Sequence, residues 1–310
     1  MNIVPIAFAF DNNLVMPACV CISSLMMNAK ADTFYDIFIL HSAQKGIDKS
    51  GLDRIPEYYH NCRVNYREVG NDFDGAFEIR GITTPAYYRL LIPEVIPEYD
   101  KIIYSDVDVI FRTDLSEVYS EDLTGYYIGA TYDLGLCLSH DGYKYLSSVN
   151  GLEVGEYIQS GFIILNSAKL REMSMPTVFK QFASKKLRYQ DQDILNISCR
   201  GHIKIIPYMY NMTDQLFYYL EKEPDSITGK YDNSDLRKAK TCGTLHYNGY
   251  KPWKSYCANF DIWWEYYRKS PFFDEKYYFD FFYSRIDEYD RLSLVKRIKI
   301  LLRYFVYGKK

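Results

Sequence analysis

The chain has 310 residues, of which 48% are hydrophobic and 25% charged, and this balance is that of a folded protein rather than a disordered one. Its 37 basic and 40 acidic side chains leave a net charge of −3, whereas a nucleic-acid-binding protein would carry a strong basic excess. We therefore expect no nucleic-acid partner, and the aromatic content of 17%, with 32 tyrosines, suits both core packing and stacking against sugars.

Predicted strands alternate with predicted helices through most of the chain. Residues 3–10 form a nearly continuous apolar run, which is typical of a strand buried on both faces. A helix is predicted over residues 16–27 and a short helical segment over 87–91. This alternation predicts an α/β fold in which a mainly parallel sheet carries helices on both faces. Further strands are predicted at residues 36–40, 63–69, 101–105, 126–132, 161–166 and 203–207.

The character of the sequence changes after about residue 262, where Tyr, Phe and Trp mix with charged residues ahead of a basic helix. We therefore predict one domain over residues 1–262 and an aromatic and basic helical extension over residues 263–310. No stretch of about 18 uncharged apolar residues occurs, so no membrane-spanning helix is expected. The N-terminus lacks a basic segment and a cleavage site, so no signal peptide is expected either.

Seven cysteines are scattered along the chain, and an odd number at irregular spacing argues against a disulfide framework. Reduced thiols in a cytoplasmic protein are the simpler interpretation. Cys19 and Cys21 share a C-x-C spacing, but they lie in an apolar run. We therefore expect them in the core rather than in a metal site.

Several nucleotide-binding and hydrolase motifs are absent. Neither G-x-G nor G-x-x-x-x-G-K-[ST] occurs, which removes the dinucleotide fingerprint and the P-loop. H-E-x-x-H and G-x-S-x-G are also missing, which removes the zincin and serine-hydrolase signals. If the protein binds a nucleotide, it must hold it through a metal ion rather than through a glycine-rich loop.

Three Asp-x-Asp tripeptides are the informative acidic features. Asp72 and Asp74 lie in a turn-like segment, where a solvated turn is the simplest explanation. Asp106 and Asp108 interrupt an apolar segment, where two carboxylates are costly unless they are paired or bind a cation. Residues two apart in an extended chain point to the same side, so both carboxylates can reach one metal ion. They also follow a predicted parallel strand, where ligands bind in open α/β sheets.

The remaining polar candidates lie later in the chain. Asp191 and Asp193 precede an apolar run, so a helix cap with a first-turn acid explains them as well as a functional site does. His246 is followed by Gly249 and Lys251, an arrangement that can place imidazole on a metal and ammonium on a phosphate. Oxygen ligands plus one imidazole suit Mn²⁺ or Mg²⁺ with a diphosphate completing the coordination.

The sequence resembles the retaining glycosyltransferases of family 8, which include bacterial lipopolysaccharide galactosyl- and glucosyltransferases and glycogenin. The resemblance implies a single-domain fold of the GT-A type, a UDP-sugar donor, Mn²⁺ as the cofactor and retention at the anomeric carbon. It runs from about residue 3 to about residue 256 and rests on motifs at residues 6–13, 88–90, 104–108, 158–166, 191–196 and 246–253.

The resemblance also implies roles for individual residues. The positions that hold the uridine correspond here to Ala9, Asp11 and Asn13. The metal-binding positions correspond to Asp106, Asp108 and His246, of which the first also lies near the sugar. With these ligands the resemblance implies Mn²⁺, and Mg²⁺ suits the same oxygen and imidazole donors.

Three further positions bear on the reaction. An arginine beside the donor sugar and diphosphate corresponds to Arg89, and the residues that line the reacting face correspond to Asp191 and Gln192. Retention through a covalent intermediate needs a carboxylate beneath the sugar, about where Gln192 is expected. An amide is a poor nucleophile, although Asp191 is adjacent. We therefore favour front-face displacement, in which the departing phosphate oxygen helps deprotonate the acceptor hydroxyl.

The phosphate-binding loop of the family corresponds to Gly249 and Lys251, and a sugar contact is implied at Gln159. Two departures from the family pattern occur here. Gln159 and Ser160 stand where the family often has Asn-Ser or Asn-Ala. Lys251 follows His246 by five residues, where six is common.

Taken as a whole, the resemblance implies a hexosyltransferase that uses UDP-glucose or UDP-galactose. The acceptor is expected to be a saccharide or a lipid-linked saccharide in the synthesis of lipopolysaccharide, capsule or another surface glycan. Two alternatives stay open. One is a self-glucosylating primer like glycogenin, for which the 32 tyrosines offer acceptor hydroxyls. The other is a non-catalytic module that binds a UDP-sugar.

The C-terminal tail, residues 291–310, contains seven basic and no acidic side chains. An anionic bilayer attracts such residues at about 1 kcal/mol each. We therefore predict a cytoplasmic protein that lies peripherally on the inner face of the cytoplasmic membrane. The alternative is a terminal helix that packs its apolar face on its own domain. In a helix, one arc would carry Leu294, Val295, Ile298, Leu301, Leu302 and Phe305.

Overall fold

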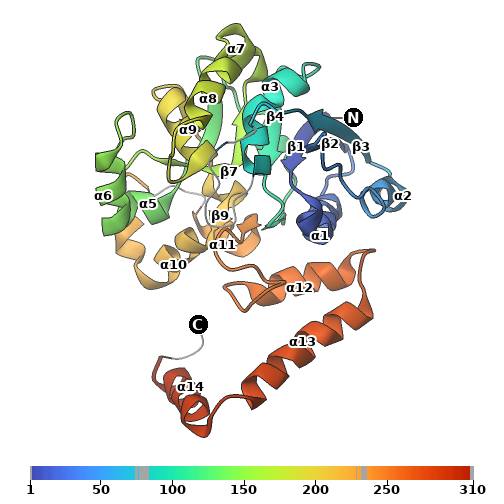
Figure 1. Cartoon of the computed structure of the whole chain (residues 1–310), viewed down its shortest axis with the longest axis vertical. Coiled ribbons are helices and arrows are strands. Elements are labelled where there is room, and N and C mark those ends of the chain that lie inside the picture. Colours follow the sequence, from blue (N-terminus) through green and yellow to red (C-terminus); the bar gives the residue numbers. More distant parts are fainter. Residues whose placement is uncertain (1, 74–75, 77–83, 228, 232–235, 308–310) are drawn as a thin grey trace.

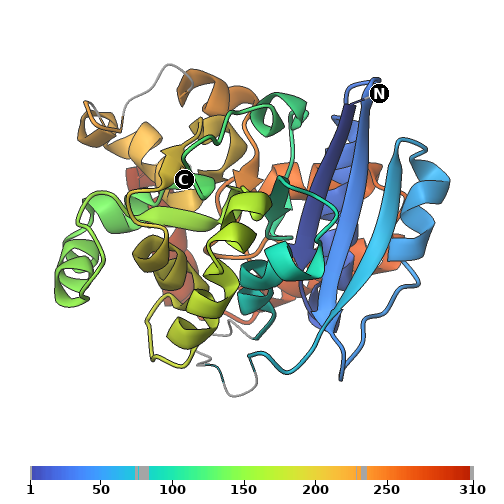
Figure 2. The ribbon, with the colours of Figure 1, turned by 90° about the horizontal axis from the view of Figure 1, so that it is seen from above.

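A computed structural model describes residues 2–307 apart from 74–75, 77–83, 228 and 232–235. Within it, seven strands form one twisted sheet (Figures 1 and 2), in the order β3-β2-β1-β4-β7-β6-β8. The strands are β1 (Asn2–Ala9), β2 (Thr33–Ser42), β3 (Cys62–Val69), β4 (Ile102–Ser105), β6 (Ile128–Tyr132), β7 (Ile158–Leu165) and β8 (Ile203–Ile205).

The strand directions confirm the predicted mainly parallel sheet. β1 runs parallel to both β2 and β4, β2 parallel to β3, and β6 parallel to β8. β7 is the exception, because it pairs antiparallel with β4 and with β6. Its N-terminal end therefore lies at the sheet edge where the parallel strands have their carboxyl ends. Polar residues at the start of β7 can thus meet residues that follow β1 and β4.

Helices cover both faces of the sheet. β1 is central, and its side chains alternate between the two hydrophobic clusters. On one face pack α1 (Val15–Met27), α2 (Ile55–Tyr58) and α4 (Ser116–Tyr119). On the other pack the 3₁₀ helix η3 (Thr84–Leu91), α3 (Ile92–Val95), α7 (Ser167–Glu172), α8 (Met175–Ala183) and α9 (Gln190–Ser198).

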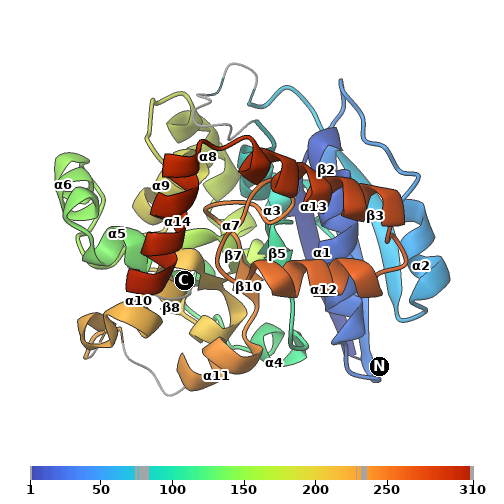
Figure 3. The ribbon, with the colours of Figure 1, turned by 90° about the horizontal axis from the view of Figure 1, so that it is seen from below.

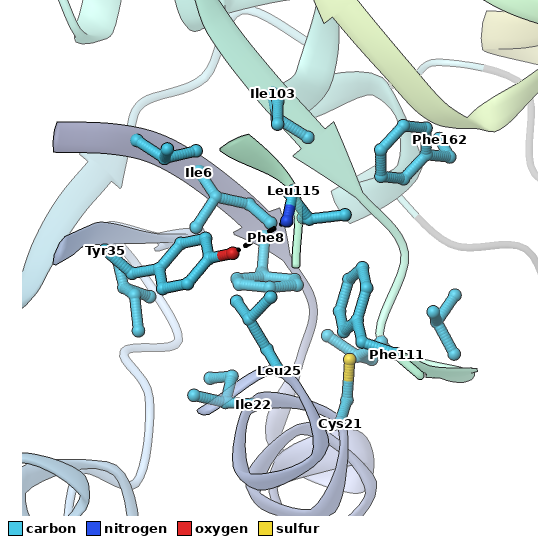
Figure 4. Close-up of a cluster of buried hydrophobic side chains, with 14 of the residues drawn as sticks. Ile6, Phe8, Cys21, Ile22, Leu25, Tyr35, Ile103, Phe111, Leu115 and Phe162 are labelled. Atoms are coloured by element: carbon cyan, nitrogen blue, oxygen red, sulfur yellow. Dashed lines mark hydrogen bonds between the residues drawn. The ribbon is translucent and has the colours of Figure 1, made fainter. Parts of the chain in front are cut away.

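The cluster beneath α1 shows how the apolar sequence runs are buried. Figure 4 shows Ile22 and Leu25 of α1 directed toward Phe8 of β1, with the Tyr35 hydroxyl accepting a hydrogen bond from the Leu115 N–H at 2.9 Å. Cys21 lies in this cluster as a free thiol. Cys19 does too, so the core interpretation of the C-x-C spacing is confirmed.

A second, three-stranded sheet was not predicted. Two-residue strands are too short to show an alternating pattern, so periodicity could not reveal them. Its strands are β5 (Val109–Ile110), β10 (Leu245–His246) and β9 (Met212–Thr213). β10 pairs antiparallel with β5, which sets His246 opposite Val109. This pairing brings His246 beside Asp106 and Asp108, which follow β4.

Short helices connect these strands. The remaining α-helices of this part are α5 (Leu134–Leu138), α6 (His140–Ser148), α10 (Asp214–Lys222) and α11 (Leu236–Cys242). The remaining 3₁₀ helices are η1 (Asn12–Leu14), η2 (Leu52–Arg54), η4 (Tyr208–Tyr210) and η5 (Pro224–Ile227).

Three helices end the chain: α12 (Phe260–Lys269), α13 (Glu275–Asp290) and α14 (Leu294–Tyr307). Figure 3 shows α12 and α13 crossing the face that carries α1. The expected boundary after residue 262 falls inside α12, whose Trp263 and Trp264 are buried with residues of α10 and β10. The division into a domain and an extension thus stays a prediction. No helix in the described ranges is long and apolar enough to cross a bilayer.

Candidate active site

A cavity of about 730 Å³ opens at the edge of the main sheet where β1 and β4 end. This edge is where open α/β sheets bind ligands. Its lining comes from segments far apart in the sequence: the residues after β1 and β4, the start of β7, the first turn of α9 and the loop after β10. The lining includes Ala9, Asp11, Arg89, Asp106, Asp108, Gln159, Asp191, Gln192, His246, Gly249 and Lys251.

Asp106, Asp108 and His246 form a compact cluster whose potential ligand atoms all lie within 4.8 Å of one another. The Nε2 atom of His246 lies 3.7 Å from Oδ2 of Asp106 and 3.4 Å from Oδ1 of Asp108. The β5–β10 pairing sets this arrangement, together with a hydrogen bond from the Tyr247 N–H to the Asp108 carbonyl at 2.9 Å. Oδ1 of Asp108 is buried, and no residue in the described part of the chain donates a hydrogen bond to it. Two carboxylates, one imidazole and an orphaned buried oxygen fit a hard divalent cation such as Mn²⁺ or Mg²⁺.

Arg89, at the end of η3, lies between the acidic groups of the cavity. Its guanidinium is 2.8 Å from Oδ1 of Asp106 and 3.2 Å from Oδ2 of Asp191, and it donates to the Ser160 carbonyl at 2.7 Å. The Arg89 side chain is only 5% exposed, so these contacts compensate a buried cation. Burial raises the pKa of Asp191 to about 6, although the Arg89 guanidinium opposes the shift.

The loop after β10 brings Lys251 into the cavity. Its ammonium contacts Oδ2 of Asp108 and donates to the Tyr247 carbonyl at 2.5 Å. Burial alone would raise the pKa of Asp108, but the Lys251 ammonium beside it holds that pKa below its ordinary value. The Gly249 N–H donates to Asp214 at 3.2 Å, and a Cβ at position 249 would lie 2.7 Å from that carboxylate. A glycine therefore lets this loop approach α10 closely.

Gln192 lies at the side of the cavity nearest β7. Its Oε1 accepts from the Ser160 N–H at 3.1 Å, and its Nε2 donates to Asp133 at 3.0 Å. Asp133 lines the cavity and was not predicted. It also caps α5 by accepting from the Leu136 N–H, and an aspartate between a strand and a helix resembles an ordinary cap in the sequence. Burial raises the pKa of Asp133.

Two of the three uridine-binding candidates line the cavity in the structure. Ala9 and Asp11 line the cavity, whereas Asn13 is exposed in η1 and is not in the lining. The Asn13 N–H donates to the Asp11 carboxylate at 2.9 Å. Asn13 is therefore connected to the cavity through its hydrogen bond to Asp11.

The other two Asp-x-Asp tripeptides have different environments. Asp72 lies in a turn and pairs with Lys180 at 2.9 Å, while Asp74 lies outside the described residues. Asp193 accepts from the Tyr157 hydroxyl at 2.6 Å and from the Tyr189 N–H, the N-cap of α9, at 2.8 Å. Neither aspartate is the N-cap of α9: Asp193 is a first-turn acid that bonds the N-cap N–H, whereas Asp191, two residues earlier, faces the cavity.

Known proteins resemble this chain in sequence and in fold. The family model described as glycosyl transferase family 8 matches residues 5–257. A putative glycosyltransferase of Haemophilus influenzae is 30% identical over 219 residues, which cover 69% of this chain and 63% of that protein. The chain thus spans less than two thirds of the Haemophilus protein. A lipopolysaccharide 1,2-glucosyltransferase of Escherichia coli is 23% identical over 265 residues, covering 82% of this chain and 74% of that protein.

A solved structure shares the fold. The galactosyltransferase LgtC, crystallised in complex with donor and acceptor sugar analogues, superposes with a TM-score of 0.71 at 24% identity. The match covers 88% of this chain and 99% of the LgtC chain. The predicted GT-A type fold, with its mainly parallel sheet flanked by helices and its C-terminal helical segment, is therefore confirmed.

Proposed function

Because the chain belongs to glycosyltransferase family 8, we propose that it is a retaining hexosyltransferase that uses a UDP-sugar. It transfers glucose or galactose to a hydroxyl group of a saccharide acceptor in the synthesis of lipopolysaccharide, capsule or another surface glycan. The observation that carries this proposal is one cavity in which Asp106, Asp108 and His246 converge beside two cations, Arg89 and Lys251. The name of the Escherichia coli relative, a lipopolysaccharide glucosyltransferase, supports the substrate class.

The donor is held along the cavity by groups of opposite charge. Ala9 and Asp11 bind the uridine, with Asn13 orienting Asp11 through its backbone N–H. Asp106, Asp108 and His246 would hold Mn²⁺, or Mg²⁺, which when bound supplies a Lewis acid for the diphosphate leaving group.

The cationic side chains neutralise charge that develops as the sugar leaves. The Lys251 ammonium can donate to a phosphate oxygen from the same loop as Gly249, whose own N–H is held by Asp214. Arg89 pairs with Asp106 and Asp191, so it orients both carboxylates beside the sugar. Fixed charges of this kind cost no reorganisation during the reaction.

The residues beneath the sugar favour front-face displacement. Gln192 has an amide where a nucleophilic carboxylate would be needed, and that amide is held between Ser160 and Asp133. Oδ2 of Asp191 accepts from the Ser160 hydroxyl at 2.9 Å and pairs with Arg89, which lowers its nucleophilicity. We propose that the bond from the anomeric carbon to the phosphate oxygen breaks first. That oxygen takes the acceptor proton while the acceptor oxygen bonds on the same face.

Incubation with UDP-glucose or UDP-galactose and a panel of saccharide acceptors is expected to release UDP. Proton NMR of the early product is expected to show an α-linkage, because retention keeps the configuration of the α-linked donor. A β-linked product would contradict the mechanism. Absence of UDP release with every donor and acceptor would favour a non-catalytic binding module. A mass increase of the intact protein by whole hexose units would indicate a self-glucosylating primer.

We further propose that the tail holds the protein on an anionic membrane surface, where a lipid-linked acceptor would lie. Figure 1 shows α14 at the lower end of the molecule, beyond α12 and α13. Five apolar side chains of its predicted arc are at least 46% exposed, so these five are open to solvent rather than buried in the core. An exposed apolar arc flanked by basic residues suits insertion at a bilayer interface. The five are Leu294, Val295, Ile298, Leu301 and Leu302.

Removal of residues 291–310 is expected to abolish binding to vesicles of phosphatidylglycerol and phosphatidylcholine while leaving UDP release unchanged. Replacing Lys296 and Lys299 by glutamine should weaken binding about 30-fold, at about 1 kcal/mol per basic residue. The matched control replaces Lys45 and Lys144, two exposed lysines outside the tail, and should bind like the unaltered protein. Sedimentation with the vesicles measures binding. If the truncated protein still sediments with them, the tail has no membrane role.

A further inference from the structure

We propose that Asn211 is a positioning residue that holds the His246 ring with Nε2 directed at Asp106 and Asp108. The proposal rests on the proposed function, because it concerns the residues that would hold the divalent cation. Asn211 directly precedes β9, the neighbour of β10 in the small sheet. Its side chain is 1% exposed, and its Oδ1 lies 2.9 Å from Nδ1 of His246.

The orientation of the Asn211 amide follows from a chain of hydrogen bonds that starts at the backbone. The Gly161 N–H can only donate, and it donates to Oε1 of Gln159 at 2.6 Å. Nδ2 of Asn211 donates to the same Oε1 at 2.8 Å and to the hydroxyl oxygen of Thr131 at 3.1 Å. Reversing the Asn211 amide would place two acceptor oxygens against each other at that 2.8 Å separation. Oδ1 therefore faces the histidine.

An acceptor at Oδ1 of Asn211 requires a donor on the histidine. Nδ1 of His246 therefore carries a proton, and in the neutral form of the ring the lone pair lies on Nε2. Nε2 is 3.4 Å from Oδ1 of Asp108, an oxygen to which none of the described residues donates a hydrogen bond. Two acceptor atoms this close and buried repel each other unless a cation lies between them. The Gly161 N–H thus determines, through Gln159 and Asn211, which nitrogen of His246 is available to a metal.

The test measures metal binding and ring state rather than activity alone. Asn211→Leu keeps the approximate volume but removes the acceptor, and it is expected to weaken Mn²⁺ binding in the presence of UDP about 10- to 100-fold. Asn211→Asp keeps an oxygen opposite Nδ1 but sets its other oxygen against Oε1 of Gln159, so it is expected to bind Mn²⁺ more tightly than Asn211→Leu and more weakly than the unaltered protein. Thr131→Val removes a partner of Asn211 without altering the bond to His246, so it serves as the matched control. Electron paramagnetic resonance of free Mn²⁺ measures the dissociation constants.

Nitrogen-15 NMR of histidine-labelled protein, with diamagnetic Mg²⁺ and UDP, gives an independent result. The unaltered protein is expected to show a protonated Nδ1 and a proton-free Nε2 for His246, and Asn211→Leu a mixture of tautomers. Unchanged affinity and ring state in a folded Asn211→Leu variant would overturn the positioning role, as would equal losses in Thr131→Val. If the unaltered protein itself bound no Mn²⁺ and released no UDP, the proposed function would fail too.

Discussion

Replacing Asp108 by asparagine is expected to lower the rate of hexose transfer by a factor of about 100 or more. Asparagine keeps the shape of the side chain but removes the negative charge from a site with two carboxylates and one imidazole. It also leaves the Lys251 ammonium without its carboxylate partner. UDP release under saturating donor and Mn²⁺ titration together measure the effect.

The control for Asp108→Asn is Asp72→Asn. Asp72 comes from another Asp-x-Asp tripeptide, but it lies in a turn and pairs with Lys180 outside the cavity. That variant should keep full activity. Excess EDTA should abolish turnover of the unaltered protein, and added Mn²⁺ should restore it. Full turnover in EDTA would contradict the assignment of Asp106, Asp108 and His246 as metal ligands.

Replacing Gly161 by alanine is expected to reduce transfer by a similar factor although it adds only a methyl group. A Cβ at this position would lie 2.3 Å from Cε1 of His246 and 2.6 Å from Oδ2 of Asp106. Neither neighbour can move freely, because His246 is held by Asn211 and Asp106 by Arg89. At least one ligand atom must therefore be displaced, and a misplacement of about 1 Å costs about 100-fold in rate.

Overpacking at a single buried position costs about 1–3 kcal/mol, so the Gly161→Ala protein should still fold. The control is Gly70→Ala, because among the described residues the nearest heavy atom to a Cβ there would be Oδ2 of Asp72 at 4.0 Å. Thermal unfolding, Mn²⁺ affinity and UDP release should be measured on both variants. The expected pattern is a large loss of Mn²⁺ affinity and rate for Gly161→Ala alone. Wild-type rates in that variant would show that the ligands have room to shift.

The sequence predicted those features that depend on neighbours along the chain. Alternation and apolar runs identified the strands of the main sheet, because burial repeats with a local period. Asp106 and Asp108 were recognisable as a site because two carboxylates in an apolar segment need a counter-charge. The same local logic placed Cys19 and Cys21 in the core, where both lie.

Long-range pairing decided how the site is assembled. Lys251 contacts Asp108 from 143 positions away, and strands of only two residues hold that loop in place. Asn211 follows a 3₁₀ helix as an ordinary polar residue, and no sequence pattern marks its bond to His246. Asp133 was missed for the same reason, since its capping role is all that the local sequence shows.

The sequence also could not predict the direction of β7 or the exposure of the C-terminal helix. An alternating or apolar run has the same period in either direction, so β7 could not be recognised as antiparallel. The amphipathic pattern of residues 294–305 fits a helix that packs on its own domain as well as one that does not. The sequence by itself thus determined the family, the strands of the main sheet and the acidic pair. Only the tertiary structure decided the partners of that pair and the exposure of the tail, because both depend on contacts between segments far apart in the chain.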